Sequence, residues 1–291
     1  MAADDLHDGL VDNKLAEKTI LFSVGHRCTS ASLIKEMRHK FETYPFDWVV
    51  SKLDVLVHCI ETDFVEYLRV ENYVEKQSET FNLCDDVKTH VCNENIIYNK
   101  YYEDEYIYEK TENKIGTYGM KLAMSHHDIR QEKDYQYFQR CIERFKKILA
   151  LPQQKFYLYV HPIMGMAEYE LNVGYGGVLT YFNAFSDYLK TRTNNAVGIF
   201  FVVVKNEERK GQVDVLFETE DIIVQTLFTN QNLIDGGGVY SGDFYTEQFK
   251  MLVTIENIIT KKKESFKTKT GKWTLERHGK WSATSKELEM S

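Results

Sequence analysis

The hydrophobic positions of the chain form short apolar runs, and amphipathic stretches separate them. Continuous apolar runs are typical of strands that are buried on both faces of a parallel sheet. Such runs lie at residues 18–25, 155–162 and 196–205, and residues 213–229 provide one or two more. We therefore expect a sheet whose strands are covered on both sides.

The amphipathic stretches between these runs carry apolar residues at helical spacing. The clearest one begins at residue 134 and ends at residue 150. Its apolar face consists of Phe138, Cys141, Ile142, Phe145, Ile148 and Leu149. Weaker patterns of the same kind lie at residues 28–41, 51–68, 178–192 and 246–259. Each of these stretches is predicted to be a helix that covers the sheet.

The order of the predicted elements indicates the fold class. From residue 134 to residue 205 a helix, a strand, a helix and a strand follow one another, which is typical of an α/β fold. We expect a Rossmann-like, open and mostly parallel sheet flanked by helices, and the length accommodates two lobes. The expected divisions are a polar extension, an N-terminal α/β lobe with a tyrosine-rich insertion, a C-terminal α/β lobe and a basic tail, at residues 1–18, 19–133, 134–260 and 261–291.

The composition indicates which partners and which cellular compartment to expect. A net charge of −8 and only three prolines argue against a nucleic-acid surface and against long disordered linkers. The five cysteines include no CxxC pair, the N-terminus lacks the character of a signal peptide, and no apolar stretch is long enough to form a transmembrane segment. We therefore expect a cytoplasmic protein with free thiols and no nucleic-acid partner. The sequence leaves the oligomeric state open, a homodimer included.

The first apolar run ends in a turn that carries reactive side chains. Gly25 permits a tight turn, and His26, Arg27 and Cys28 follow directly before a predicted helix. The start of that helix offers free N–H groups and a positive dipole end, which favour a thiolate at Cys28 or a bound diphosphate or carboxylate. No GxGxxG or P-loop pattern accompanies the turn. A nucleophile, a ligand-binding turn and a purely structural turn remain as alternatives.

Two further segments contain candidate bases. Asp47 lies between Phe46 and Trp48, so partial desolvation is expected to raise the pKa of its carboxyl group towards that of a general base. The alternative is an aspartate that caps a helix or stabilises a turn. His127 and Asp128 precede the strongest predicted helix, and either side chain can act as a base. Here the alternative is that Asp128 caps this helix.

The ends of two predicted strands complete the set of candidates. His161 and Lys205 each end an apolar run, and ligands of open α/β folds bind beyond the carboxyl ends of the strands. The two side chains are therefore candidates for binding an anionic ligand, with solvated strand ends as the alternative. No metal site is expected, because Cys84, His90 and Cys92 lack zinc spacing and no Asp-x-Asp motif occurs.

Several of these motifs, in this order, resemble an uncharacterised domain family that is labelled as papain-like cysteine peptidase. The similarity covers roughly residues 19–205, and members of the family also look like proteins of large algal viruses and of bacterial glycan gene clusters. It rests on Ser23, Gly25 and Cys28, on Pro45, Phe46, Asp47 and Trp48, and on His127 and Asp128. The label implies a nucleophilic Cys28 and a histidine base.

The expected architecture is also similar to that of metal-independent glycosyltransferases with two Rossmann lobes. That resemblance implies a base among Asp47, His127 and Asp128, and it implies that Trp48 stacks on a sugar. The turn at residues 25–28, together with His161 and Lys205, would then hold the diphosphate. On this basis the sequence predicts a glycosyltransferase that uses a nucleotide-sugar donor and a glycan acceptor without a further cofactor. A papain-like cysteine hydrolase is the alternative.

Overall fold

A computed structural model describes most of the chain, in two compact units that comprise Met1–Leu252 and Val253–Ser291. The described residues are 19–26, 28–76, 81–84, 87–89, 96–102, 122–124, 126–164, 166, 170, 177–230 and 245–277. Within them, no helix has the length and apolar character needed to cross a membrane.

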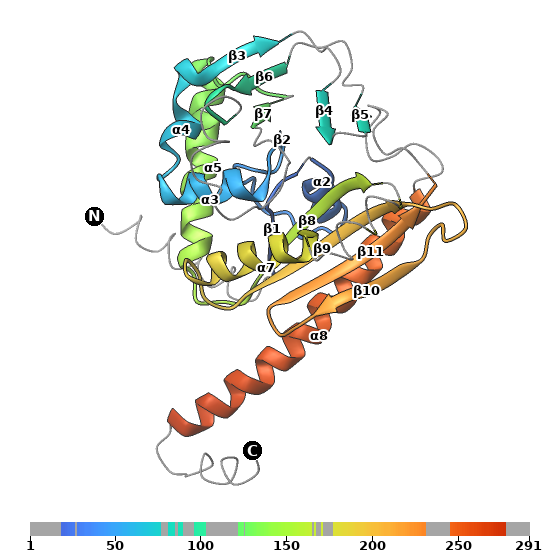
Figure 1. The fold of residues 1–291 in the computed structure, drawn as a ribbon. Coiled ribbons are helices and arrows are strands. Elements are labelled where there is room, and N and C mark those ends of the chain that lie inside the picture. The colour runs from blue at the N-terminus through green and yellow to red at the C-terminus, as the bar shows by residue number, and fades with distance from the viewer. Residues whose placement is uncertain are drawn as a thin grey trace. The chain divides into compact units, whose positions relative to one another are not determined.

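A five-stranded sheet forms the centre of the first unit, and its strand order is β1-β8-β9-β11-β10 (Figure 1). The strands are β1 (Ile20–Ser23), β8 (Lys155–Met164), β9 (Ala196–Lys205), β11 (Ile222–Thr229) and β10 (Val213–Glu218). All neighbouring strands pair in parallel except β10 and β11, which are antiparallel. The predicted α/β class with an open, mostly parallel sheet is therefore confirmed.

The two-lobed arrangement is not confirmed. β1 and β8 come from either side of the expected lobe boundary after residue 133, and they pair with each other in one sheet. The other predicted divisions of the chain stay predictions.

Helices flank this sheet. α2 (Cys28–Glu36) packs against β1 and β8, and α7 (Gly177–Lys190) packs against β9 and β11. In α7 the ring of Phe182 stacks on Phe200 of β9 with a centroid distance of 4.4 Å. These contacts form because the apolar face of each helix packs on the continuous apolar surface of the strands.

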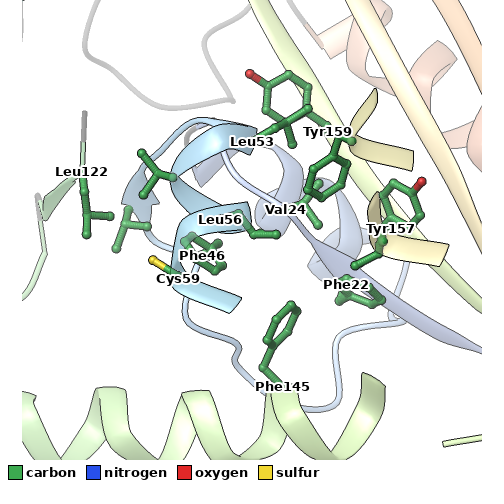
Figure 2. Close-up of a cluster of buried hydrophobic side chains, with 14 of the residues drawn as sticks. Phe22, Val24, Phe46, Leu53, Leu56, Cys59, Leu122, Phe145, Tyr157 and Tyr159 are labelled. Atoms are coloured by element: carbon green, nitrogen blue, oxygen red, sulfur yellow. The ribbon is translucent and has the colours of Figure 1, made fainter. Parts of the chain in front are cut away.

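α5 (Glu132–Ala150) also packs on the core, and all six residues of its predicted apolar face are buried. The Phe145 ring lies edge-on to Phe22 of β1 and to Phe46, at centroid distances of 5.7 and 6.2 Å. Figure 2 shows these rings together with residues of α3 (Leu53–Glu61) and β8. Aromatic rings are thus a main component of the described core.

Residues 49–124 contribute a second, antiparallel sheet with the strand order β2-β7-β6-β3. Its strands are β2 (Val49–Val50), β7 (Ala123–Met124), β6 (Ile96–Asn99) and β3 (Tyr73–Lys76). β4 (Phe81–Cys84) and β5 (Val87–Thr89) form a separate two-stranded sheet. Since β2 follows the Phe46–Trp48 segment and β7 precedes His127, this sheet brings two of the predicted motifs to neighbouring strands.

One predicted helix is broken. The pattern at residues 51–68 predicts a single helix, but α3 ends at Glu61 and a short α4 (Val65–Leu68) follows. Asp63 and Phe64 have φ angles of 53° and 62°, which end the helix in the left-handed region. Phe64 is 1% exposed and packs against Phe46 and Phe145, so tertiary packing decides the path of the chain here.

The last described element is α8 (Tyr245–Arg277), and the basic run at residues 260–273 lies within it. A run of lysines with scattered apolar residues is compatible with a helix, because lysine has a good helix propensity.

Candidate active site

The turn after β1 is built around Gly25. Its φ angle of +96° lies in a region that residues with a side chain rarely adopt, and an added Cβ would lie 2.3 Å from Ser51 Oγ. The next residue is held in place, since Ser51 donates its N–H to the His26 carbonyl at 3.1 Å. Glycine is therefore required at this position both for backbone conformation and for space.

Cys28 is the first residue of α2, and its neighbour Ser30 anchors this end of the helix. The buried Ser30 hydroxyl donates to the Gly25 carbonyl and accepts from Val160 N–H of β8, both at 3.1 Å. This pair of hydrogen bonds ties the first turn of α2 to the turn and to the sheet. The start of a helix presents unpaired N–H groups and a partial positive charge, and in α2 the Cys28 thiol lies at this end.

Cys28 differs from the other cysteines whose side chains are described. It is partly exposed, whereas Cys59 and Cys141 are buried. Burial raises the pKa of the Cys59 thiol to about 12 and that of the Cys141 thiol to about 11, which keeps both in the unreactive protonated form. Of these three, Cys28 is the thiol that a reactant can reach.

Two histidines lie beside the turn. His26 and His161 are 2% and 5% exposed, and their rings are nearly parallel, with centroids 6.5 Å apart. Tyr159 packs against both rings, at 6.2 and 6.3 Å. The parallel register explains this proximity, because Val24 N–H donates to Leu158 O and His161 follows three residues later on β8.

The start of α3 approaches the same turn from the other side. Ser51 contacts Gly25, and α3 begins two residues later at Leu53. The Tyr181 hydroxyl of α7 accepts a hydrogen bond from Leu53 N–H at 2.8 Å and lies 3.4 Å from Asp54 Oδ1. Two helices, α2 and α3, therefore begin at the turn, and both contribute positive helix ends.

Lys52 and Asp54 are the site residues that sequence reasoning missed. Lys52 is 6% exposed. Burial raises the pKa of the Asp54 carboxyl group from 3.8 to about 6, and the Lys52 charge opposes this shift. The sequence does contain a signal for these two residues, because they are charged and stand at the start of a largely apolar predicted helix.

Asp47, a predicted base, is fully buried. Its Oδ2 is paired with Lys40 and accepts Tyr44 N–H at 2.6 Å, while its Oδ1 has no hydrogen-bond partner among the described residues. Burial raises its pKa, as expected, and the charge of Lys40 opposes the shift. Lys40 Nζ also lies 5.6 Å from the centroid of the partly buried Trp48 ring. In this arrangement the Asp47 carboxylate is closed to a substrate.

His127 and Asp128 do not form a couple with each other. His127 Nδ1 lies 3.2 Å from Asp134 Oδ1, and its ring stacks on Tyr137 with centroids 4.5 Å apart. Asp128 pairs with Arg130 at 2.8 Å, and this hydrogen bond holds the pKa of the Asp128 carboxyl group below its ordinary value. The partner of His127 is thus an aspartate seven residues away, on the first turn of α5.

The remaining candidates are placed as follows. Lys205 is an exposed residue at the end of β9, three residues beyond Val202, which pairs with His161. Three residues span roughly 10 Å along a strand, so the two side chains share an edge of the sheet without adjoining each other. Arg27 lies outside the described residues. In the described part of the chain, no group of three potential metal ligands occurs.

The fold and the site define an α/β protein in which a partly exposed cysteine starts a helix beside buried histidines. The model of the family described as "putative papain-like cysteine peptidase" matches residues 19–173. This is more than half of the 291 residues, and the chain belongs to that family. No curated protein and no solved structure matches the chain.

The predicted glycosyltransferase is therefore wrong. The family is described by a peptidase activity, and nothing in the comparisons supports a nucleotide-sugar donor or a glycan acceptor. The error has a clear origin: alternating strands and helices predict the fold correctly, but many unrelated activities occur on such folds. The coarser prediction of an enzyme agrees with the family description, and the alternative prediction, a cysteine hydrolase, is closer to it.

Proposed function

We propose that the protein is a cysteine-dependent hydrolase of amide or ester bonds, with Cys28 as its nucleophile. The observation that carries the proposal is the position of Cys28, a partly exposed thiol at the start of α2, in a turn that packs beside the buried His161. A thiol becomes an effective nucleophile where a base accepts its proton and a positive helix end stabilises the thiolate. The proposal is supported by the nearness of His161 to His26, which lies two residues before Cys28.

Each residue has a role in the proposed reaction. His161 accepts the thiol proton, and the thiolate attacks the substrate carbonyl carbon. The N–H groups at the start of α2 stabilise the negative charge on the carbonyl oxygen. The bond to the leaving group then breaks, the leaving group takes the proton from the His161 imidazolium, and water hydrolyses the thioester to release the acid and the free thiol.

His127 is the second candidate for the base. The observation in its favour is Asp134, which lies 3.2 Å from Nδ1 and would fix the ring and its tautomer as an orienting carboxylate does in catalytic triads. Against it, its described contacts are with α5 residues, whereas His161 adjoins His26 of the turn. We therefore assign the base to His161.

The other predicted ligand-binding residues fit the proposal as substrate contacts. Gly25 shapes the turn that carries Cys28, and Arg27, Trp48 and Lys205 stay predicted contacts for the flanking parts of the substrate. The reaction itself needs no cofactor. A reducing, cytoplasmic setting, which stays a prediction, would keep the Cys28 thiol free.

Alkylation kinetics test the proposal without knowledge of the substrate. Iodoacetamide should modify Cys28 selectively in the folded protein, and Cys28→Ser should abolish this modification in peptide mass spectra. His161→Asn should slow the alkylation at neutral pH by about two orders of magnitude, as expected for loss of a base. His127→Asn is the matched control and should leave the rate within a few-fold of wild type.

Two outcomes would contradict the assignment. Equal labelling of Cys28 and of the buried Cys59 and Cys141 would show that Cys28 is not activated. A large effect of His127→Asn with none of His161→Asn would transfer the role of base to His127.

A further inference from the structure

The first turn of α8 contains an acidic side chain that lies apart from the Cys28 site. Glu247 is 0% exposed, and neither of its carboxylate oxygens has a hydrogen-bond partner among the described residues. The adjacent Gln248 is 4% exposed, and its amide nitrogen also has no partner within that described part. Buried polar groups in folded proteins are paired almost without exception, and a buried charge is paired most strictly of all.

The helix start alone does not compensate for this burial. A carboxylate in the first turn of a helix gains from the helix dipole, but that gain is much smaller than the cost of removing a charge from water. Two adjacent residues with three unpaired atoms, two acceptors and one donor, therefore indicate a partner from outside the described part of the chain.

The position of the pair is one at which α/β proteins bind ligands. Lys250, one turn further along α8, donates a hydrogen bond to the Gly211 carbonyl, and Gly211 N–H donates to Phe228 O at 2.7 Å. Phe228 is the residue before the last one of β11. The start of α8 therefore lies at the carboxyl edge of the sheet, where ligands of open α/β folds bind.

We propose that Glu247 and Gln248 form a binding site for a guanidinium group. A carboxylate with both oxygens available matches the planar fork of a guanidinium, which donates two parallel hydrogen bonds. The Gln248 amide then donates to an oxygen of the same ligand, such as a carbonyl or carboxylate. A metal ion fits less well, because no cluster of three metal-ligating side chains occurs in the described ranges. This site does not depend on the function proposed for Cys28.

Thermal unfolding with two matched probes tests the site. Arginine should raise the melting temperature, and citrulline, its uncharged analogue, should not. At arginine concentrations ten times the dissociation constant, the folding equilibrium should shift about elevenfold. N-acetyl-arginine amide and a short peptide with a central arginine distinguish the free amino acid from an arginine side chain as the source of the group.

Two variants locate the effect. Glu247→Gln should abolish the response to arginine, and Gln248→Ala should weaken it. Glu208→Gln removes the same charge from an exposed position on the turn before β10, and it should respond like wild type. Equal shifts with arginine and citrulline, or an unchanged arginine response in Glu247→Gln, would overturn the proposal. So would a more stable Glu247→Gln protein together with no response of wild type, because the buried pair would then have no need of a guanidinium ligand.

The test does not rest on the variants alone. The comparison of arginine with citrulline uses the unaltered protein, so a variant that fails to fold leaves it decisive. Alkylation of Cys28 is a separate measurement, and either proposal can therefore fail without the other.

Discussion

Asp54 lies in the first turn of α3, and its surroundings favour the neutral acid. The residue is partly exposed, and its carboxylate accepts a hydrogen bond from Val55 N–H at 3.1 Å. Burial nevertheless raises its pKa from 3.8 to about 6. The residue therefore binds a proton more tightly in the folded chain than in the unfolded chain, which makes the free energy of unfolding depend on pH.

We predict that Asp54→Asn alters this dependence in a defined direction. Because the folded pKa is raised, protonated Asp54 favours folding, and that contribution is present below about pH 4 and lost as the pH rises through about 6. Wild type and variant should have similar free energies of unfolding at pH 4, and the variant should be more stable by roughly 2–3 kcal/mol at pH 7.5. Urea unfolding at several pH values measures this difference.

Asp128→Asn provides a control of opposite sign. Arg130 lowers the pKa of Asp128, so its charged form favours folding, and the contribution is lost only as the pH falls through the folded pKa. The prediction for Asp54 would be contradicted if the free energies of unfolding of wild type and Asp54→Asn differed by the same amount at pH 4 and at pH 7.5.

At the scale of elements, the start of α2 depends on a single hydroxyl group. Ser30 joins Gly25 O and Val160 N–H, and it thereby sets where the helix begins relative to β8. β1 ends at Ser23, so Ser30 satisfies a donor of β8 beyond the end of its neighbouring strand. Such an anchor matters for Cys28 because the thiol lies two residues before it.

We predict that Ser30→Ala destabilises the protein by about 1–3 kcal/mol, because Val160 N–H is left buried without a partner. It should also slow the alkylation of Cys28, since the first turn of α2 loses its attachment to the sheet. Ser32→Ala is the matched control, because Ser32 has a similar burial on the same helix. Chemical denaturation and iodoacetamide kinetics measure the two effects. Equal behaviour of the two variants would show that Ser30 does not position the helix.

At the scale of the whole molecule, one aromatic cluster joins segments that are far apart in the chain. Phe145 of α5 contacts Phe22 of β1, Phe46 of the Pro45–Trp48 block and Phe64 before α4. The sheet, the loop and the helix are therefore held by the same buried side chain (Figure 2). This explains why Phe46, the residue before Asp47, is a large apolar one.

We predict that Phe145→Ala lowers the free energy of unfolding by about 3–5 kcal/mol, as for other large-to-small changes in a core. Val215→Ala on β10 should cost less than about 0.5 kcal/mol, because Val215 is 60% exposed. Urea titrations of both variants provide the measurement. A loss in Phe145→Ala no larger than that in Val215→Ala would contradict the view that this cluster unites the fold.

The sequence by itself determined the α/β class, the strands of the main sheet and the buried face of α5. Those features follow from local patterns, because a strand covered on both faces must be apolar throughout and a covering helix must be apolar on one side. It also indicated Gly25 and Cys28, since a turn between a buried strand and a helix is a local feature.

Only the tertiary structure decided which groups meet. The register of β1 with β8 places His161 beside His26, although the two are 135 positions apart in the chain. Packing also paired His127 with Asp134, closed Asp47 against Lys40 and ended α3 at Glu61. Spacing along the chain indicates burial and periodicity, but it does not show strand register or contact between distant segments.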